Sequence, residues 1–228
     1  MRAAIYNPYL DTLGGGERYT MAFVSVLEEL GFRVDVEWRS KNIREKLEER
    51  FGIDLTGINF VRNIKRGDGY DVCFWVSDGS IPTLRSRKNF LHFQVPFHDV
   101  NGKTLLNRMK LFRIKKIICN SNFTKTFIDK EYGVNSVVVY PPVDTDKIKP
   151  GRKENMILYV GRFSSLAQSK RQDVLIKTFK RFYEEFSDWK MVLAGGTEVG
   201  VDGFLGKLEK LSYGYPIEIV KSPTFKEI

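Results

Sequence analysis

The chain has 228 residues, of which 42% are hydrophobic and 29% charged, and this is enough for one large or two modest domains with a buried core. The composition excludes a wholly disordered, collagen-like or disulfide-rich protein. Lys and Arg outnumber Asp and Glu by 37 to 28, and the resulting charge of +9 favours anionic partners: nucleic acid, phosphorylated small molecules or an anionic membrane surface.

The first part of the chain alternates short β-branched runs with helical segments. A strand is predicted over 3–6, followed by a turn-rich loop that ends in glycines at 14–16. Apolar residues then recur at helical spacing from 19 to 30, and a second strand follows over 33–38. Further strands are predicted at 59–61, 71–76, 89–93, 116–119 and 136–139, and further helices at 43–51, 102–112 and 124–132. This alternation predicts an α/β fold with a parallel sheet covered on both faces.

A proline-containing, charged segment interrupts this pattern after residue 142, and the opening pattern then recurs. We therefore expect an N-terminal domain over 1–142, a linker over 143–153 and a partial C-terminal domain over 154–228. The second domain is predicted to contain strands at 156–160, 190–194 and 217–220 and helices at 171–186 and 202–211.

The two cysteines, Cys73 and Cys119, each lie in an apolar run that predicts a buried strand. Reduced thiols in a reducing compartment are the expected state, since two cysteines make no disulfide framework. No long apolar run follows Met1 as in a signal peptide, and no apolar stretch of about 18 residues occurs. We therefore expect a cytoplasmic protein.

Two loops follow strands, where doubly wound sheets bind ligands. The first, LGGGERY, suits a phosphate-binding loop or a plain tight turn, and its spacing fits neither a Walker loop nor GxGxxG. The second, GRFSSLAQSKRQD, places Arg162 at a strand end and Lys170 just before a helix. A guanidinium and an ammonium at this spacing suit a diphosphate, and a solvated basic loop is the alternative.

Several segments together resemble one enzyme family. LGGGERY, ICNSNFTKTFI, VVVYPPVD, YVGRF with KRQDVLIKTF, and MVLAGG, in this order between residue 3 and about 220, resemble the retaining glycosyltransferases of the GT-B fold, family four (glycosyltransferase group 1). SDGSIP and HFQVPF are similar to segments of members that extend lipid-linked or cell-surface glycans. The resemblance implies two Rossmann-like domains with parallel sheets, the second incomplete here. It also implies an acceptor bound mainly by the N-terminal domain and a nucleotide sugar bound mainly by the C-terminal domain.

The resemblance also assigns roles to individual residues. It implies that Arg162 and Lys170 act in catalysis by holding the donor diphosphate and stabilising its departing charge, with Gly161 beside them in the donor site. Gly15 and Gly16 match the glycine loop that closes over the donor phosphates. A hexose would then pass from a nucleotide diphosphate sugar to a glycan or lipid-linked glycan with retention, the leaving phosphate taking the acceptor proton. This scheme needs no metal or cofactor.

Two residues are candidates for the acceptor side. Some relatives carry a histidine near the acceptor, and aligning the proline of HFQVPFHD places Gln94 rather than His92 at that position. His92 fits either a role in the cleft or a buried histidine at a strand end. His98 with Asp99 fits a surface loop.

The family's carboxylate motif, two glutamates separated by seven residues, would follow PTFKEI and is not present in the chain. The remaining glutamates of this region are expected on the surface: Glu198, Glu209, Glu218 and Glu227. We therefore expect a fragment, a truncated frame or one part of a split enzyme that is inactive alone. The alternative is a noncatalytic module that binds a sugar nucleotide or a glycan and needs a partner for chemistry.

Basic and apolar residues interleave between 103 and 116. The basic ones are Lys103, Arg108, Lys110, Arg113, Lys115 and Lys116. Such a helix fits either peripheral contact with anionic lipid on the cytoplasmic membrane face or a core-facing helix with a solvated back. Aromatic residues are scattered and form no RNA-stacking signature, so nucleic acid is not expected as a partner.

Overall fold

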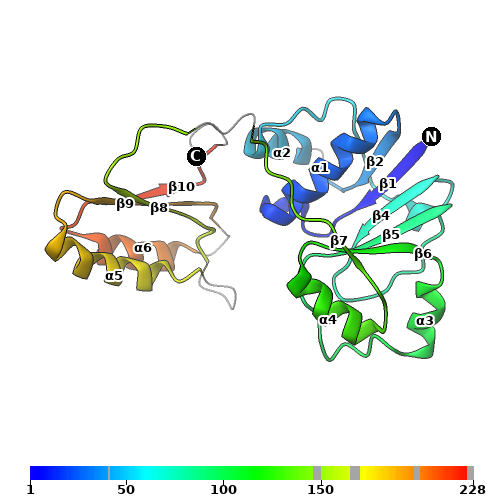
Figure 1. Cartoon of the computed structure of the whole chain (residues 1–228). Helices are drawn as coiled ribbons and strands as arrows, with labels where there is room; N and C mark the ends of the chain where they lie inside the picture. The colour runs from blue at the N-terminus through cyan, green and yellow to red at the C-terminus, as the bar shows by residue number, and fades with distance from the viewer. Residues whose placement is uncertain (41, 146–149, 165–169, 198–200, 225–228) are drawn as a thin grey trace. The chain divides into compact units, whose positions relative to one another are not determined.

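The computed structural model describes residues 1–40, 42–145, 150–164, 170–197 and 201–224. These fall into two compact units, the first formed by Met1–Glu48 with Ile53–Asp144 and the second by Thr145–Ile228 with Glu49–Gly52. Each unit contains one parallel β-sheet with α-helices (Figure 1), which confirms the predicted α/β class. Part of the predicted linker, 146–149, lies outside the described residues.

The first unit has a seven-stranded sheet in the order β3-β2-β1-β4-β5-β6-β7. Its strands are β1 (Arg2–Tyr6), β2 (Arg33–Glu37), β3 (Asn59–Val61), β4 (Val72–Val76), β5 (Lys88–Phe93), β6 (Ile114–Cys119) and β7 (Val137–Val138). Its α-helices are α1 (Gly15–Glu29), α2 (Ile43–Phe51), α3 (Leu105–Leu111) and α4 (Asn122–Tyr132), with short 3₁₀ turns η1 (Leu10–Thr12) and η2 (Lys65–Gly67). The strand order reverses between β1 and β4, which makes this the switch point of the sheet.

The central strands of this sheet bury runs of apolar residues. Ala3, Ala4 and Ile5 of β1 are all completely buried. Successive side chains of a strand point to opposite faces, so both faces of β1 are covered. Cys73 and Cys119 are buried free thiols in β4 and β6, as the sequence predicts.

Helix boundaries in this unit follow from capping residues. The Ser121 hydroxyl accepts a hydrogen bond from the Thr124 backbone N–H, so α4 begins two residues before its predicted start. Gly133, at φ +66°, ends the same helix in the left-handed conformation. Thr104 caps α3 in the same way, which shortens the predicted helix at its N-terminal end.

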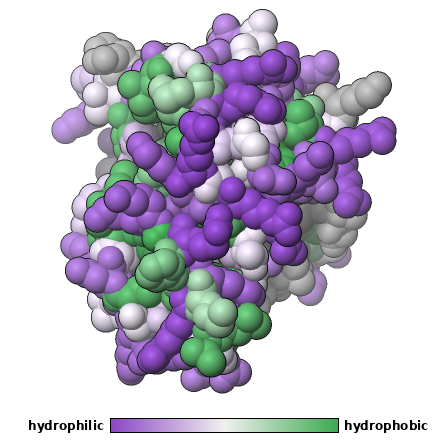
Figure 2. Space-filling view, turned by 90° about the vertical axis from the view of Figure 1, so that its right-hand side faces the viewer, coloured by the Kyte–Doolittle hydropathy of each residue, from purple (hydrophilic) through white to green (hydrophobic). Residues whose placement is uncertain are grey.

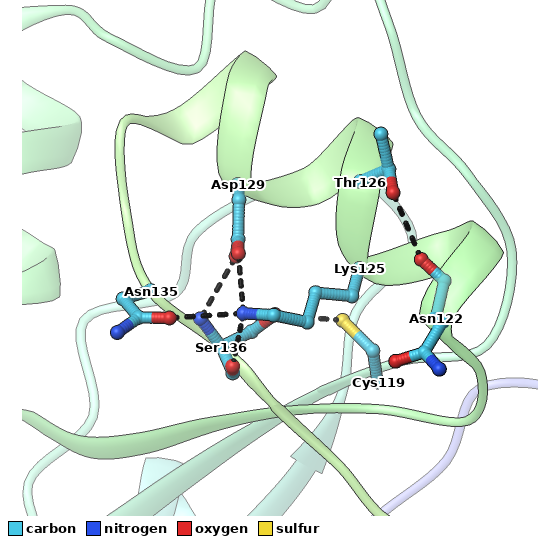
Figure 3. Close-up of polar contacts among 7 residues, drawn as sticks. All are labelled: Cys119, Asn122, Lys125, Thr126, Asp129, Asn135 and Ser136. Carbon is cyan, nitrogen blue, oxygen red and sulfur yellow. Dashed lines mark hydrogen bonds and ion pairs between the residues drawn. The ribbon is translucent and has the colours of Figure 1, made fainter.

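A lysine on α4 fixes the chain segment that leads into β7 (Figure 3). The Lys125 ammonium contacts the Asp129 carboxylate one turn along the helix and donates to the side chain of Asn135 and the backbone oxygen of Ser136. The Asp129 carboxylate also accepts from the Ser136 backbone N–H at 2.8 Å. These contacts hold residues 135–136 against α4, and the strand that follows, β7, is only two residues long.

The second unit has a three-stranded sheet in the order β10-β9-β8. Its elements are β8 (Met156–Val160), α5 (Gln172–Glu185), β9 (Lys190–Gly195), α6 (Asp202–Ser212) and β10 (Ile217–Lys221). Both helices lie on one side of the sheet (Figure 1), where Ile176 and Phe179 of α5 pack with Leu193 of β9 in a buried cluster. All the strands and helices predicted for both domains are present.

One carboxylate in the first unit is almost completely buried. Asp35 of β2 is 3% exposed and accepts hydrogen bonds from Arg2 Nη2 at 2.9 Å, Tyr70 Oη at 2.8 Å and Asn59 Nδ2 at 3.0 Å. Burial alone would raise the pKa of Asp35, but these hydrogen bonds together hold it below the ordinary value. Asp35 therefore links three strands and the turn before β4 as a charged acceptor.

We expect Asp35→Asn to lower the free energy of unfolding by about 1–3 kcal/mol at pH 7, because the charge-assisted hydrogen bonds are lost. Since the folded-state pKa is depressed, the contribution of Asp35 is present above the ordinary carboxyl pKa and disappears as pH falls through the folded value. Urea unfolding at pH 7 and pH 3 measures both effects. Asp68→Asn, at an exposed position, is the control, and an Asp35→Asn variant as stable as this control at pH 7 would contradict the assignment.

Candidate functional site

The switch point places two loops at the carboxyl edge of the first sheet. One follows β1 and ends at Gly14, so the predicted glycine loop continues into Gly15 and Gly16 as the first residues of α1; the other follows β4 and begins at Ser77. Open α/β sheets bind ligands in the crevice beyond the strand ends at such a reversal. The glycine loop predicted from the sequence therefore lies where this class of sheet binds its ligand.

The glycine loop is held in place by an acidic residue at the start of α1. The Glu17 carboxylate accepts hydrogen bonds from the Gly14 backbone N–H at 2.9 Å and from Thr12 Oγ1 at 2.7 Å. The first N–H groups of a helix have no intrahelical partner and carry partial positive charge, which suits an anion. Glu17 satisfies one donor of this end and fixes the loop, while its negative charge offsets part of the attraction for a phosphate.

The two candidate glycines have different surroundings. A Cβ atom at Gly16 would lie 2.2 Å from Gln94 Oε1, whereas a Cβ atom at Gly15 would meet nothing within 4 Å. Gln94 Nε2 also donates to the Gly16 backbone oxygen at 2.9 Å. The structure thus brings together Gly16 and Gln94, and it gives Gly16 a packing role against Gln94 while Gly15 leaves open space beside the loop.

Asn120 is a further member of this site that the sequence interpretation did not single out. It follows β6, and its Nδ2 donates to the Gln94 backbone oxygen at 2.7 Å. Its Oδ1 accepts from Thr124 Oγ1 at 2.9 Å, which ties it to α4. A polar residue directly after a buried strand is the signal that could have identified it.

His92 lies in the core of the first unit and has no exposed surface. Its ring stacks on Tyr19 with centroids 4.5 Å apart and lies 5.3 Å from the ring of Phe74. Its Nδ1 donates to the Ile118 backbone oxygen at 3.2 Å, and burial lowers the pKa of His92 to about 4. The burial of the ring favours the alternative given from the sequence, a histidine buried at a strand end, and the acceptor-side role of His92 stays a prediction. His98 lies on the surface beside Asp99.

The predicted basic loop of the second unit joins β8 to α5. Gln172, the first residue of α5, is completely buried, and its Nε2 donates to the backbone oxygens of Gly161 at 3.2 Å and Arg162 at 3.0 Å. The Lys170 backbone oxygen accepts a hydrogen bond from Tyr159 Oη at 2.9 Å. Arg162 is half-buried and Lys170 is exposed, and residues 165–169 between them lie outside the described residues. Both ends of the loop are therefore fixed at the carboxyl end of β8.

Gly195 at the end of β9 allows the neighbouring backbone to approach closely. A Cβ atom there would lie 2.1 Å from the Gly161 backbone oxygen. Thr197 Oγ1 and Ser222 Oγ lie 3.2 Å apart just beyond the ends of β9 and β10. This edge of the second sheet thus combines open backbone and hydroxyl groups beside the Arg162 loop, and the sequence interpretation did not identify the two hydroxyls.

The remaining predicted surface residues agree with the structure where it describes them. Glu209 and Glu218 are exposed, and Glu209 pairs with Lys221 at 2.7 Å. Glu198 and Glu227 lie outside the described residues.

A pocket of about 460 Å³ lies elsewhere, at the amino ends of the first three strands. Its basic lining includes Arg2 and Arg44, but Arg2 pairs with Asp35 and Arg44 donates to the Ile58 backbone oxygen. Doubly wound sheets bind their ligands at the opposite edge, so this pocket is not the candidate site.

Comparison with known proteins connects the chain to glycosyltransferases through its fold. No protein-family model matches the chain, and no curated protein sequence matches it. Solved structures of α-glucosyltransferases are similar to it. One is a complex with UDP-glucose and DNA containing an abasic site (TM-score 0.58, 14% identity), and a second is a complex with UDP and a 13-mer DNA containing a central A:G mismatch (TM-score 0.60, 12% identity). A third is an α-glucosyltransferase in complex with UDP (TM-score 0.54, 12% identity).

These matches cover 96–97% of this chain and 67–68% of the neighbouring chains. At such low identity they show the fold alone: a glycosyltransferase-like α/β fold of the partial GT-B, Rossmann-like type. Two of the three neighbours hold DNA, so the comparison gives no support to the expectation that nucleic acid is not a partner. None of the helices in the described parts of the chain is long and apolar enough to cross a membrane.

The burial of His92 predicts a loss of stability at mildly acidic pH. Its folded-state pKa of about 4 lies below the ordinary value of 6.5, so the unfolded chain takes up the proton first and stability falls as pH drops from about 6.5 toward 4. We expect about 2 kcal/mol of the unfolding free energy to be lost between pH 7 and pH 5 through this residue. His92→Phe, which keeps an aromatic ring between Tyr19 and Phe74, is expected to remove this loss. Urea unfolding at both pH values measures it, and equal pH dependence in the two proteins would contradict the assignment.

Proposed function

We propose that the chain binds a nucleotide diphosphate sugar and acts in the transfer of its hexose, with retention of configuration, to a glycan or lipid-linked glycan. The observation that carries this proposal is that both described ends of the basic loop of the second unit are held by hydrogen bonds. Buried Gln172 holds the backbone of Gly161 and Arg162, and Lys170 lies at the other end of the same loop. This loop follows a parallel strand in a fold shared with α-glucosyltransferases, two of which hold UDP.

In the proposed reaction, negative charge develops mainly on the leaving diphosphate. The guanidinium of Arg162 and the ammonium of Lys170 would stabilise the negative charge that develops as the sugar–oxygen bond breaks. The N-terminal end of α5, which begins two residues after Lys170, adds the partial positive charge of its first N–H groups. The acceptor hydroxyl attacks from the face that the diphosphate leaves, and the leaving phosphate takes its proton. The positions of these groups then account for catalysis without a protein base.

DNA is a second candidate acceptor. Two neighbouring α-glucosyltransferases hold DNA, and the charge of +9 suits a polyanion. A noncatalytic sugar-nucleotide or glycan-binding module remains the alternative to a transferase. Product analysis by mass spectrometry with glycan, lipid-linked glycan and duplex DNA acceptors identifies the acceptor if hexose is transferred. A chain that binds UDP and transfers hexose to none of them is either the binding module or the part of a split enzyme expected from the sequence.

The basic pair can be tested by donor binding alone. We expect Arg162→Ala and Lys170→Ala each to raise the Kd for UDP about ten- to a hundredfold, because each removes a charge-assisted phosphate contact. Lys177→Ala, at an exposed position later in α5, is the matched control and is expected to leave the Kd unchanged. Isothermal titration calorimetry measures the values, and unchanged UDP binding in both site variants with an intact fold would refute the diphosphate assignment.

The two glycines of the first unit give a second, paired test. Gly16→Ala is expected to lower the melting temperature only slightly, by about 2–4 °C, because the new Cβ meets the end of the flexible Gln94 side chain, which moves aside at the cost of its hydrogen bond to the Gly16 backbone oxygen. Combining it with Gln94→Ala is expected to restore part of the loss. Gly15→Ala meets open space, so it is expected to leave the melting temperature unchanged and to raise the Kd for UDP severalfold by blocking the approach of a phosphate. If Gly15→Ala leaves the Kd for UDP unchanged, this segment is a structural turn.

A further inference from the structure

The apolar residues of helix α3 face solvent instead of the core. Leu105 is 77% exposed, Leu106 62%, Met109 65% and Phe112, directly after the helix, 93%. We call these four residues the α3 patch. None of the residues of α3 is buried. A surface helix normally turns its apolar stripe toward the core, so this exposure excludes the core-facing alternative considered from the sequence.

The packing of α3 shows that this orientation is fixed. Residues 105, 109 and 112 follow one another at helical spacing on one stripe, whereas Leu111 packs against a buried cluster of the first unit. Asn107 Nδ2 donates to the Asn101 backbone oxygen at 3.3 Å. The inner side of the helix is therefore held by Leu111 and by polar contacts, and the α3 patch is left outside.

The segment that leads into α3 is also fixed. The Glu131 carboxylate of α4 accepts hydrogen bonds from the backbone N–H groups of Asp99, Val100 and Gly102. Thr104 then caps the helix. These contacts position the helix before any partner binds, so docking would not have to order a loose segment.

The charged residues of α3 and of the segments that flank it are basic. Between residues 100 and 116 the chain has no Asp or Glu, and its basic residues there are Lys103, Arg108, Lys110, Arg113, Lys115 and Lys116. All but Lys110 are exposed. Figure 2 faces the side of the first unit on which α3 lies, and hydrophobic side chains gather among hydrophilic ones over its lower part. This segment thus combines four exposed apolar side chains with exposed basic ones and contains no acidic residue.

We propose that the α3 patch and these basic residues dock the chain on an anionic lipid bilayer. In this arrangement Leu105, Met109 and Phe112 enter the boundary between headgroups and acyl chains, and the lysines and arginines contact anionic headgroups. Nucleic acid is a poorer fit, because phosphate contacts need the cations but gain nothing from four exposed apolar side chains. The proposal does not rest on sugar transfer.

The test uses the full chain and vesicles without donor. We expect flotation with vesicles of phosphatidylglycerol and phosphatidylcholine, little binding to pure phosphatidylcholine, and release as salt rises, since the cationic contribution is screened. M109S/F112S is expected to lower the partition coefficient at least tenfold. K115Q/K116Q is expected to lower it severalfold and to flatten the salt dependence. V26S/L30S is the matched control: it removes two exposed apolar side chains from the α1 region and is expected to bind as the wild type does.

Three results would overturn the proposal. The first is absence of binding to the anionic vesicles by the wild-type chain. The second is an equal loss in M109S/F112S and in the control, since the α3 patch would then have no special role. The third is a wild-type dimer that M109S/F112S converts to a monomer with unchanged vesicle binding, which would assign the patch to a second copy of the chain. Because UDP binding is measured separately, failure here leaves the donor proposal untouched.

Discussion

The buried amide of Gln172 is the contact on which the candidate donor site depends. It holds the backbone of Gly161 and Arg162 by two hydrogen bonds, and Gly195 lets the neighbouring strand end approach within the space that a side chain would fill. A flexible basic loop would lose much of its binding energy in ordering itself around a diphosphate. The two described ends of the loop, Gly161–Arg162 and Lys170, are held by hydrogen bonds, which lowers that cost for the backbone at these positions.

In the first unit, too, hydrogen bonds from side chains hold the backbone at the carboxyl edge of the sheet. Parallel strands bring their carboxyl ends to one edge, so the loop after β1 and the residues after β5 and β6 meet there although they are far apart in sequence. Gln94 then fixes Gly16, and Asn120 fixes Gln94. The Glu17 carboxylate accepts a hydrogen bond from the Gly14 backbone N–H at the start of α1. These contacts hold the start of α1 in place, and a Cβ atom at Gly15 would meet nothing within 4 Å there.

The sequence predicts nearly all of this fold, because apolar periodicity and glycine positions determine the order of strands and helices. It also predicts where the loops with Gly15 and Arg162 lie, since both follow strands. It does not predict which side of α3 faces the core, because that depends on the contact of Leu111 with residues distant in sequence. It leaves open whether His92 is buried for the same reason, because Tyr19 of α1 and Phe74 of β4 contact the ring only in the folded unit.

The most direct measurement of the central claim is amide hydrogen exchange of the chain with and without UDP, followed by mass spectrometry of its peptides. The account predicts slower exchange on UDP binding in peptides that span Gly161–Ser164 and the first turn of α5, with no change in α3. Protection confined to the amino-edge pocket that contains Arg2 and Arg44, or no protection at saturating UDP, would contradict it.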